Sequence, residues 1–491
     1  MKQDLLFSPR IKTIPIRVMS EIRGRNWADA NARPKSIGLW LSLATGGVSS
    51  LVYLLTMATD LTWANFGADG GELITAAVTL GIPHPPGYPT YVVLGKLFSL
   101  LPSGTTALRL HLLSALAMAT AVAFITTTIY TWTGKHTWSR SAAVAAGLIF
   151  AFAPLVWGQA LIAEVYALNL AMLAVFIWTL WTKKSPWLSG LFFGLSITTH
   201  LTSLLMLPLA LALTPHKHWL RLVGGMLIGL VPFLLLPLFA NGNSPVIWGD
   251  ASTLSGWWWL VSGSLYQANL QLPSITELPN QLLHWGQSIG HQFGWFGWLL
   301  LIPAIYYAKI DAQRTGWLLI TAVFYAIYSI VYQTEDAILY FLPGFMLLMI
   351  LLSWGLKPFG HWALILPIIL LLLNFSAVNL RNQPISPNKL AVKAMTNMPT
   401  DAIVLTPGDR SIFTLWYTQN VDKQRPDLTL VDANLMAFDW YRIRLAKHNP
   451  TLQGLDKDDL VRFRQLNGEK RPFCTLSLLN PAEIHCTEAK P

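Results

Sequence analysis

Charged residues are scarce in this chain. Only 12% of its 491 residues are Asp, Glu, Lys or Arg, whereas 53% are hydrophobic and the mean hydropathy is +0.46. An ordinary soluble domain contains about 25% charged residues, so this composition excludes that class. We therefore expect a polytopic α-helical membrane protein.

Several motifs of soluble enzyme chemistry are missing. The chain has no GxxxxGK[ST] or GxGxxG segment for a nucleotide, no His/Cys cluster with zinc spacing and no GxSxG nucleophile turn. We expect neither a metal nor another cofactor. The formal net charge is +10, but the basic residues do not form one helical face interleaved with aromatics. Nucleic acid is therefore not an expected partner.

Cysteine is also rare, because Cys474 and Cys486 are the only two. Both follow residue 381, beyond which charges are frequent and apolar runs are short. AIVLT at 402–406 and LTLVDANL at 428–435 read as strands that alternate with helices, which predicts a small α/β domain over 378–491. A disulfide and two reduced thiols both remain open for this pair.

The apolar runs are long enough to cross a membrane many times. About 20 residues are needed for one helical crossing. Suitable runs lie within a predicted transmembrane domain, 37–377, that follows a basic segment, 1–36. They are found near 37–57, 108–131, 141–157, 165–181, 219–239, 293–307, 317–332, 338–354 and 362–375. The run 187–213 is too long for one comfortable span and is interrupted by polar residues.

Charge parity decides the path of that run. Lys and Arg gather in segment 1–36 and in short later loops, but none occurs between Arg221 and Lys309. Cytoplasmic loops are rich in Lys and Arg, so we interpret this lysine-free stretch as an outer loop. The distribution of Lys and Arg fits alternating cytoplasmic and outer loops if 187–213 crosses the membrane twice. It would then form two short helices with His200 at the outer tip. This predicts about eleven crossings, N-terminus inside and C-terminus outside; a single tilted span would reverse everything after it.

Two carboxylates follow the first span, in a predicted outer loop over 58–107. The segment GADGGELITAAVTLGIPHPPGYP at 67–89 places Asp69 and Glu72 three residues apart, on one face at the start of a helix. The helix dipole favours negative charge there, and the prolines of HPPGYP end the helix. An N-terminal cap followed by a proline turn is the alternative explanation.

The predicted topology gathers many polar residues on the outer side. Ionisable residues at a membrane are costly and mark functional sites. Solvation of a helix end explains any one of them, but the whole set indicates a site. The set comprises Asp69, Glu72, His84, Tyr88, Arg109, Glu164, Tyr166, His200, Asp250, Tyr266, Glu335, Asp336 and, from the C-terminal domain, Arg410.

The sequence resembles a bacterial membrane family of long-unknown function whose animal relatives look like protein O-mannosyltransferases of the GT-C fold. The resemblance is carried by DGGE at 69–72, LGIPHPPGYPTYVVLGKLFSLLP at 80–102, AEVYALN at 163–169, GLSITTHLT at 194–202, WGD at 248–250, SGSLY at 262–266 and EDAILYFLP at 335–343. It continues through PGDR at 407–410, LWY at 415–417, RPD at 425–427 and DWY at 439–441. The first 36 residues and those after about 447 show no match.

The resemblance implies a GT-C transferase that uses a sugar carried on polyprenyl or dolichyl phosphate. Asp69 is then the general base that takes the proton of the acceptor hydroxyl, with Glu72 beside it. The leaving phosphate needs cations, for which we consider Arg109, Arg410, His84 and His200 in that order. We expect inverting transfer of one sugar, with mannose as a candidate, to a protein or glycan outside the bacterial inner membrane.

Two other functions remain open. A polytopic transporter or lipid-sugar flippase is the first, although no inverted repeat is evident and the polar residues cluster at one face rather than at the midplane. An anchored binding protein is the second, and it would leave Asp69 dispensable.

Overall fold

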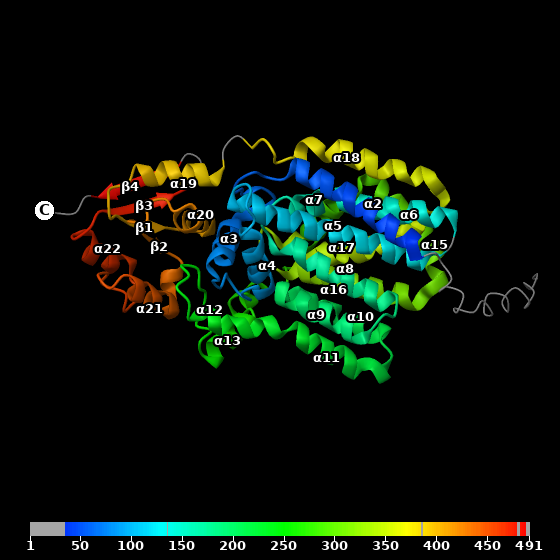
Figure 1. Cartoon of the computed structure of the whole chain (residues 1–491), viewed down its shortest axis with the longest axis horizontal. Helices are drawn as coiled ribbons and strands as arrows, with labels where there is room; N and C mark the ends of the chain where they lie inside the picture. The colour runs from blue at the N-terminus through cyan, green and yellow to red at the C-terminus, as the bar shows by residue number, and fades with distance from the viewer. Residues whose placement is uncertain (1–34, 135, 384–385, 479–481, 488–491) are drawn as a thin grey trace, which may run out of the picture.

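The computed structural model describes residues 35–134, 136–383, 386–478 and 482–487. A bundle of helices forms most of the molecule, and a small α/β domain lies at one end of it (Figure 1). In the described residues, five helices are long and apolar enough to cross a membrane, or six if one bent pair counts as a single span. The chain is an integral membrane protein. The count of about eleven crossings stays a prediction.

Many helices follow the predicted runs closely. The first spans are α2 (Lys35–Thr56), α5 (Thr106–Thr133) and the pair α6 (Thr137–Phe152) and α7 (Pro154–Ala160), which is followed by α8 (Val165–Trp181). α6 and α7 meet at 69°. Pro154 explains the bend, because proline cannot continue the hydrogen-bond ladder of the preceding helix. Later runs contain α15 (Leu301–Ala308), α16 (Ala312–Val331), α17 (Leu342–Leu352) and α18 (Ile365–Val378). Before them, α14 (Leu278–Phe293) forms where no run was predicted.

The run 187–213 does go up and back. It forms α9 (Pro186–Thr199), a 3-10 helix (Leu201–Met206) and α10 (Leu207–Leu213), with His200 extended between them. The next helix, α11 (Trp219–Gly229), packs against α9 in parallel, since Gly225 meets Trp187 and, four residues later, Gly229 meets Leu191. Because α9 and α11 run in the same direction, the chain between them must return. This confirms the two short helices predicted for 187–213.

Glycines set the close approach of α9 and α11. A Cβ atom built on Gly190 would lie 1.9 Å from the Leu222 carbonyl oxygen, and one on Gly225 would lie 2.1 Å from that of Trp187. Gly194 and Gly229 show the same crowding. Small residues four apart on both helices let the backbones touch, as in other membrane helix pairs.

The predicted cytoplasmic loops meet at one end of the bundle. The Arg314 guanidinium lies 4.9 Å from the Trp181 ring centroid, and the Lys357 ammonium lies 4.0 Å from that of Tyr307. Trp132, at the end of α5, donates a hydrogen bond to Asp311. Tryptophan rings and basic groups are typical of a membrane interface.

The opposite end holds the outer loops and the α/β domain. The first outer loop contains a 3-10 helix, η2 (Ala64–Asp69), then α3 (Gly70–Thr79) and α4 (Pro89–Ser99). Its Ile82 pairs with Ile247 of the lysine-free loop, which follows α12 (Leu236–Ala240) and contains α13 (Leu254–Val261). α12 ends the apolar stretch His216–Ala240, in agreement with the predicted run 219–239. Arg444 of the domain donates to the carbonyls of Ala240 and Gly242. The three segments predicted to be outside therefore lie together.

The α/β domain has one four-stranded sheet in the order β2-β1-β3-β4. β1 (Ile403–Thr406) pairs in parallel with β2 (Thr429–Asp432) and β3 (Phe473–Ser477), and β4 (Glu483–Thr487) is antiparallel. Its helices are α19 (Pro387–Thr396), α20 (Asp409–Asn420), α21 (Asp439–His448) and α22 (Leu460–Gly468). The first two strands and α20 confirm the predicted alternation, and the β3–β4 hairpin was not predicted.

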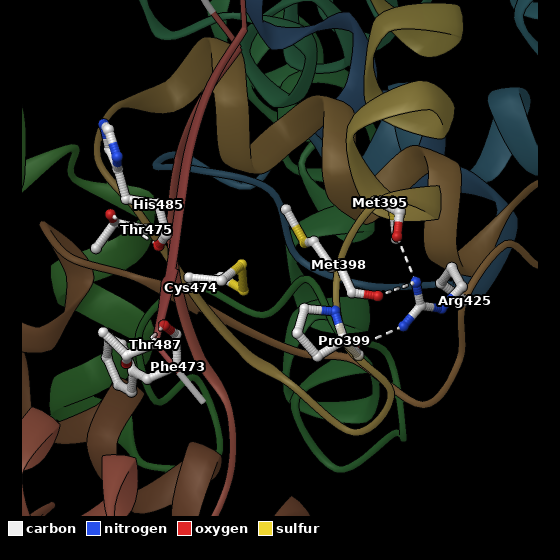
Figure 2. Close-up of a disulfide and its surroundings, with 10 residues drawn as sticks. Met395, Met398, Pro399, Arg425, Phe473, Cys474, Thr475, His485 and Thr487 are labelled. Carbon is white, nitrogen blue, oxygen red and sulfur yellow. Dashed lines mark hydrogen bonds between the residues drawn. A yellow bond between two sulfur atoms is a disulfide. The ribbon is translucent and has the colours of Figure 1, made fainter. Parts of the chain in front are cut away.

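A disulfide and the Arg425 side chain each link separate segments of this domain. Figure 2 shows the disulfide and the hydrogen bonds from Arg425 to backbone carbonyls. A disulfide joins Cys474 of β3 to Cys486 of β4, which decides the question left open by the sequence. Arg425 donates to the carbonyls of Met398 and Pro399 at 3.1 and 2.9 Å and pairs with Asp427. The RPD motif is therefore structural, because it fixes the chain that follows α19.

Candidate active site

A strained turn presents Asp69. Asn65 and Phe66 have φ of 56° and 66°, a left-handed conformation that is rare for such residues. The Asn65 side chain donates to the Gly158 carbonyl, and the Gln159 amide donates to the Asn65 carbonyl at 2.7 Å. α7 thus holds the turn in place. Asp69 makes no side-chain capping bond to α3, so capping does not explain this carboxylate.

The DGGE motif gives each residue a different contact. A Cβ atom on Gly71 would lie 2.4 Å from the Phe413 carbonyl oxygen, so glycine allows α3 to pack against α20 of the C-terminal domain. Gly70 has ordinary space, with its nearest neighbour at 3.5 Å. Glu72 is completely buried. The motif therefore places one carboxylate at the surface of the site and one beneath it.

His84 of the HPPGYP turn lies between the two carboxylates. Its Nδ1 is 2.5 Å from Glu72 Oε2, and its backbone N–H donates to Glu72 Oε1 at 3.2 Å. Its Nε2 is 3.7 Å from Asp69 Oδ2 and 2.9 Å from the Tyr88 hydroxyl. Glu72 thus fixes the imidazole ring from behind, and the ring faces Asp69.

Burial and charge both act on this triad. Burial lowers the pKa of His84, but the Glu72 and Asp69 carboxylates outweigh it and raise that pKa to about 10. Burial raises the pKa of Asp69 to about 6 against the opposing effect of His84, although the side chain keeps 34% exposure. Burial also raises the pKa of Glu72. At neutral pH we therefore expect a protonated His84 beside a largely ionised Asp69.

Asp69 and His84 border a cavity of about 970 Å³ between the bundle and the C-terminal domain. One wall is aromatic: Tyr332 and Tyr340 have ring centroids 4.7 Å apart, and His200 lies 5.6 Å from Tyr340. Glu164 is only 3% exposed, and its Oε1 has no hydrogen-bond partner among the described residues. Of the residues that line the cavity, Arg410 is the one arginine or lysine in the described structure.

Most predicted site residues converge here, and three do not. Those that line the cavity are Asp69, His84, Tyr88, Glu164, Tyr166, His200, Tyr266, Glu335, Asp336 and Arg410. Glu72 lies beneath His84 and is a positioning residue. Arg109 donates to the carbonyls of Ser99 and Leu101, so it fastens the loop before α5 and is removed from the phosphate candidates. Asp250 accepts from the backbone of Ser252 and shapes the turn before α13.

Other cavity residues were missed by the sequence analysis. Asp409 was quoted within PGDR, but only its neighbour Arg410 was selected. Tyr328, Tyr332 and Tyr340 also line the cavity, and their clustering could not be read from the sequence. No group of three His, Cys, Asp or Glu residues suited to a metal ion occurs in the part of the chain that the structure describes.

Comparison with known proteins gives consistent results. Residues 69–222 match the family model described as the Protein O-mannosyl-transferase TMEM260 N-terminal domain, and residues 387–451 match TMEM260-associated domain 2. Protein O-mannosyl-transferase TMEM260 of Mus musculus is 26% identical over 92% of this chain and 73% of its own length. The Dictyostelium discoideum protein of that name is 25% identical over 80% of this chain and 57% of its own length.

Solved structures show the same fold. ArnT from Cupriavidus metallidurans bound to undecaprenyl phosphate aligns with a TM-score of 0.54 and 15% identity, covering 90% of this chain and 93% of ArnT. Its apo state aligns with a TM-score of 0.55 and 13% identity, covering 89% and 92%. The chain has the GT-C fold, is related to the GT-C O-mannosyltransferases and is a membrane glycosyltransferase.

Proposed function

We propose that this enzyme transfers one sugar, with mannose as the first candidate, from a polyprenyl-phosphate carrier to an acceptor hydroxyl outside the bacterial inner membrane. The observation that carries the proposal is Asp69, which faces the cavity while a buried Glu72 holds His84 beside it. The names of the O-mannosyl-transferase relatives and the undecaprenyl phosphate in the ArnT title support the sugar and carrier.

Asp69 acts as the general base. The acceptor O–H proton passes to the Asp69 carboxylate while the oxygen forms its bond to the anomeric carbon. The bond from that carbon to the phosphate oxygen breaks, and the lipid phosphate leaves with the electron pair. One displacement of this kind inverts the anomeric centre. A pKa of about 6 suits the role, because the base is ionised at neutral pH and still accepts a proton.

The remaining walls serve the donor. Arg410 replaces Arg109 as our first candidate for the phosphate, because a guanidinium stays charged and can donate two parallel hydrogen bonds. Its side chain is 54% exposed, so it can change partner when a ligand enters. Glu164 and the aromatic wall around His200 are our candidates for binding the sugar. A carboxylate accepts hydrogen bonds from sugar hydroxyls, and aromatic rings stack on the apolar face of a sugar ring.

Labelled polyprenyl-phosphate sugars, incubated with the purified full chain and a membrane acceptor fraction, test the proposal. We expect transfer from at least one donor. The rate of sugar transfer should fall about a thousandfold in Asp69→Asn, because the amide cannot accept the proton. It should fall about a hundredfold in Asp69→Glu, because the longer side chain displaces the carboxylate by about 1 Å. Asp458→Asn, an exposed site outside the cavity, is the matched control. Near-normal transfer by an equally abundant Asp69→Asn enzyme would refute Asp69 as the base, and donor movement without transfer would indicate a flippase.

A further inference from the structure

The C-terminal domain supplies part of the cavity wall. Residues 407–411 directly follow β1, and Ser477 ends β3; both segments line the cavity. β1 and β3 are parallel neighbours, and the Leu478 amide donates to Ser411 Oγ at 3.1 Å. The carboxyl ends of the two strands therefore meet at the cavity.

This edge is where a sheet of this topology binds ligands. The chain leaves β1 to form β2 on one side and later adds β3 on the other, so the strand order reverses between β1 and β3. Open α/β sheets bind ligands outside the carboxyl ends of the strands at such a switch point. Here that edge is turned toward Asp69 of the bundle.

Asp409 stands at the switch point. Gly408, with φ of 80°, turns the chain from β1 into α20, and Asp409 is the first residue of that helix. Partial burial, and then the nearby Asp69 carboxylate, raise the pKa of Asp409. Both aspartates line the cavity, Asp69 from the bundle and Asp409 from the C-terminal domain.

Several contacts fix the domain in this position. Trp63 donates to Thr414 Oγ1 at 3.2 Å, and Ser386 donates to Asp60 at 2.7 Å. Tyr417 is buried against Leu61 and other apolar side chains of the first outer loop. Asp409 is therefore held at a fixed place relative to Asp69, as a binding group requires.

The mouth of the cavity lies on the same side. Arg410 and Glu335 line it with 54% and 92% exposed side chains and approach to 4.0 Å across the junction of the domain and the bundle. Under the proposed function, a water-soluble acceptor would enter past this pair, and a lipid-linked donor would arrive from the bundle. Among the described residues of the domain that line the cavity, Asp409 is the one carboxylate.

We propose that the carboxyl edge of this sheet is the acceptor-binding half of the site, where Asp409 accepts a hydrogen bond from a backbone N–H of a peptide acceptor. The inference rests on the proposed function and deepens it. The bond would hold the peptide so that its serine or threonine hydroxyl reaches Asp69. Among the described residues of its own domain, Asp409 has no ion-pair partner, and such a carboxylate suits an N–H donor.

The test uses the full chain with a labelled polyprenyl-phosphate mannose donor and synthetic peptides that carry one serine or threonine. Asp409→Asn should raise the peptide KM about tenfold. Donor KM, undecaprenyl phosphate binding and slow hydrolysis of the donor by water should stay unchanged. Asp69→Asn should lose both transfer and hydrolysis, and Asp458→Asn should resemble the wild type.

Other outcomes would overturn the inference and leave the proposed function intact. These are an unchanged peptide KM in Asp409→Asn when Asp69→Asn is inactive, a rise in donor KM instead, or transfer to an oligosaccharide but to no peptide. A change in thermal unfolding of Asp409→Asn as large as its loss of activity would also count against a binding role. A wild type that transfers from no donor removes the proposed function, and this inference with it.

Discussion

The two walls of the cavity differ in how firmly they hold their charges. On the bundle wall, Glu72 is fully buried and meets His84 at 2.5 Å. Where the domain wall begins, Arg410 of the domain and Glu335 of the bundle are 4.0 Å apart and largely exposed. Breaking a buried ion pair costs about 3–5 kcal/mol, whereas an exposed pair contributes about 0–1 kcal/mol and is screened by salt.

This difference matches two different tasks. A proton acceptor needs fixed neighbours, because its pKa depends on each nearby charge and on burial. A group that receives and releases substrates needs partners that it can exchange at little cost. We therefore assign proton chemistry to the bundle wall, and phosphate and acceptor binding to the domain wall.

After the loss expected for Asp69→Asn, the largest change should come from the bundle wall at Glu72. Glu72→Gln removes the strongest of the charges that raise the pKa of His84, so this pKa falls. We expect His84 to lose its proton at neutral pH as a result. Loss of the His84 charge raises the pKa of Asp69 by more than loss of the Glu72 charge lowers it, so the pKa of Asp69 moves above about 6. The base must be ionised to act. Activity should therefore fall at a higher pH in Glu72→Gln than in the wild type when the solution is acidified. We expect kcat/KM at pH 7 to fall about tenfold to a hundredfold, with turnover still measurable.

A pH profile of kcat/KM checks this prediction. The wild-type acid limb should lie near pH 6, and the Glu72→Gln limb should lie above it. Glu469→Gln, an exposed carboxylate of the C-terminal domain, makes the same charge change away from the cavity. A limb that does not move in Glu72→Gln would mean that Glu72 does not act through His84.

The sequence could predict the bundle wall better than the domain wall. Asp69, Glu72 and His84 lie within 16 positions of one another, and their spacing and the prolines identified the motif. The sequence could not show that the HPPGYP turn folds His84 back onto Glu72. Asp409 is far along the chain, and only the docking of the domain brings it to Asp69. Arg109 was chosen by charge alone, although loop carbonyls bind its guanidinium.

The next change tests how the two walls are joined. Gly71→Ala places a Cβ atom 2.4 Å from the Phe413 carbonyl oxygen, so α3 and α20 must move apart. Overpacking of this kind costs about 1–3 kcal/mol. We expect a lower unfolding temperature and faster proteolysis at the domain junction. Gly70→Ala is the matched control, because its Cβ has ordinary contacts from 3.5 Å. Equal effects of the two substitutions would show that the close approach does not limit docking.

The smallest change should come from the domain wall itself. Arg410→Ala removes an exposed ion pair, so unfolding should shift by less than about 1 kcal/mol. Donor binding should weaken about fivefold to tenfold at low salt, which corresponds to roughly 1–1.4 kcal/mol, and the difference from wild type should shrink as salt rises. Undecaprenyl phosphate titrations at two ionic strengths measure this. Arg109→Ala should give the reverse result, with a lower unfolding temperature and unchanged carrier affinity, because its guanidinium binds loop carbonyls outside the cavity. If Arg109→Ala weakens carrier binding and Arg410→Ala does not, the phosphate lies nearer the start of α5, and the division of labour between the two walls is wrong.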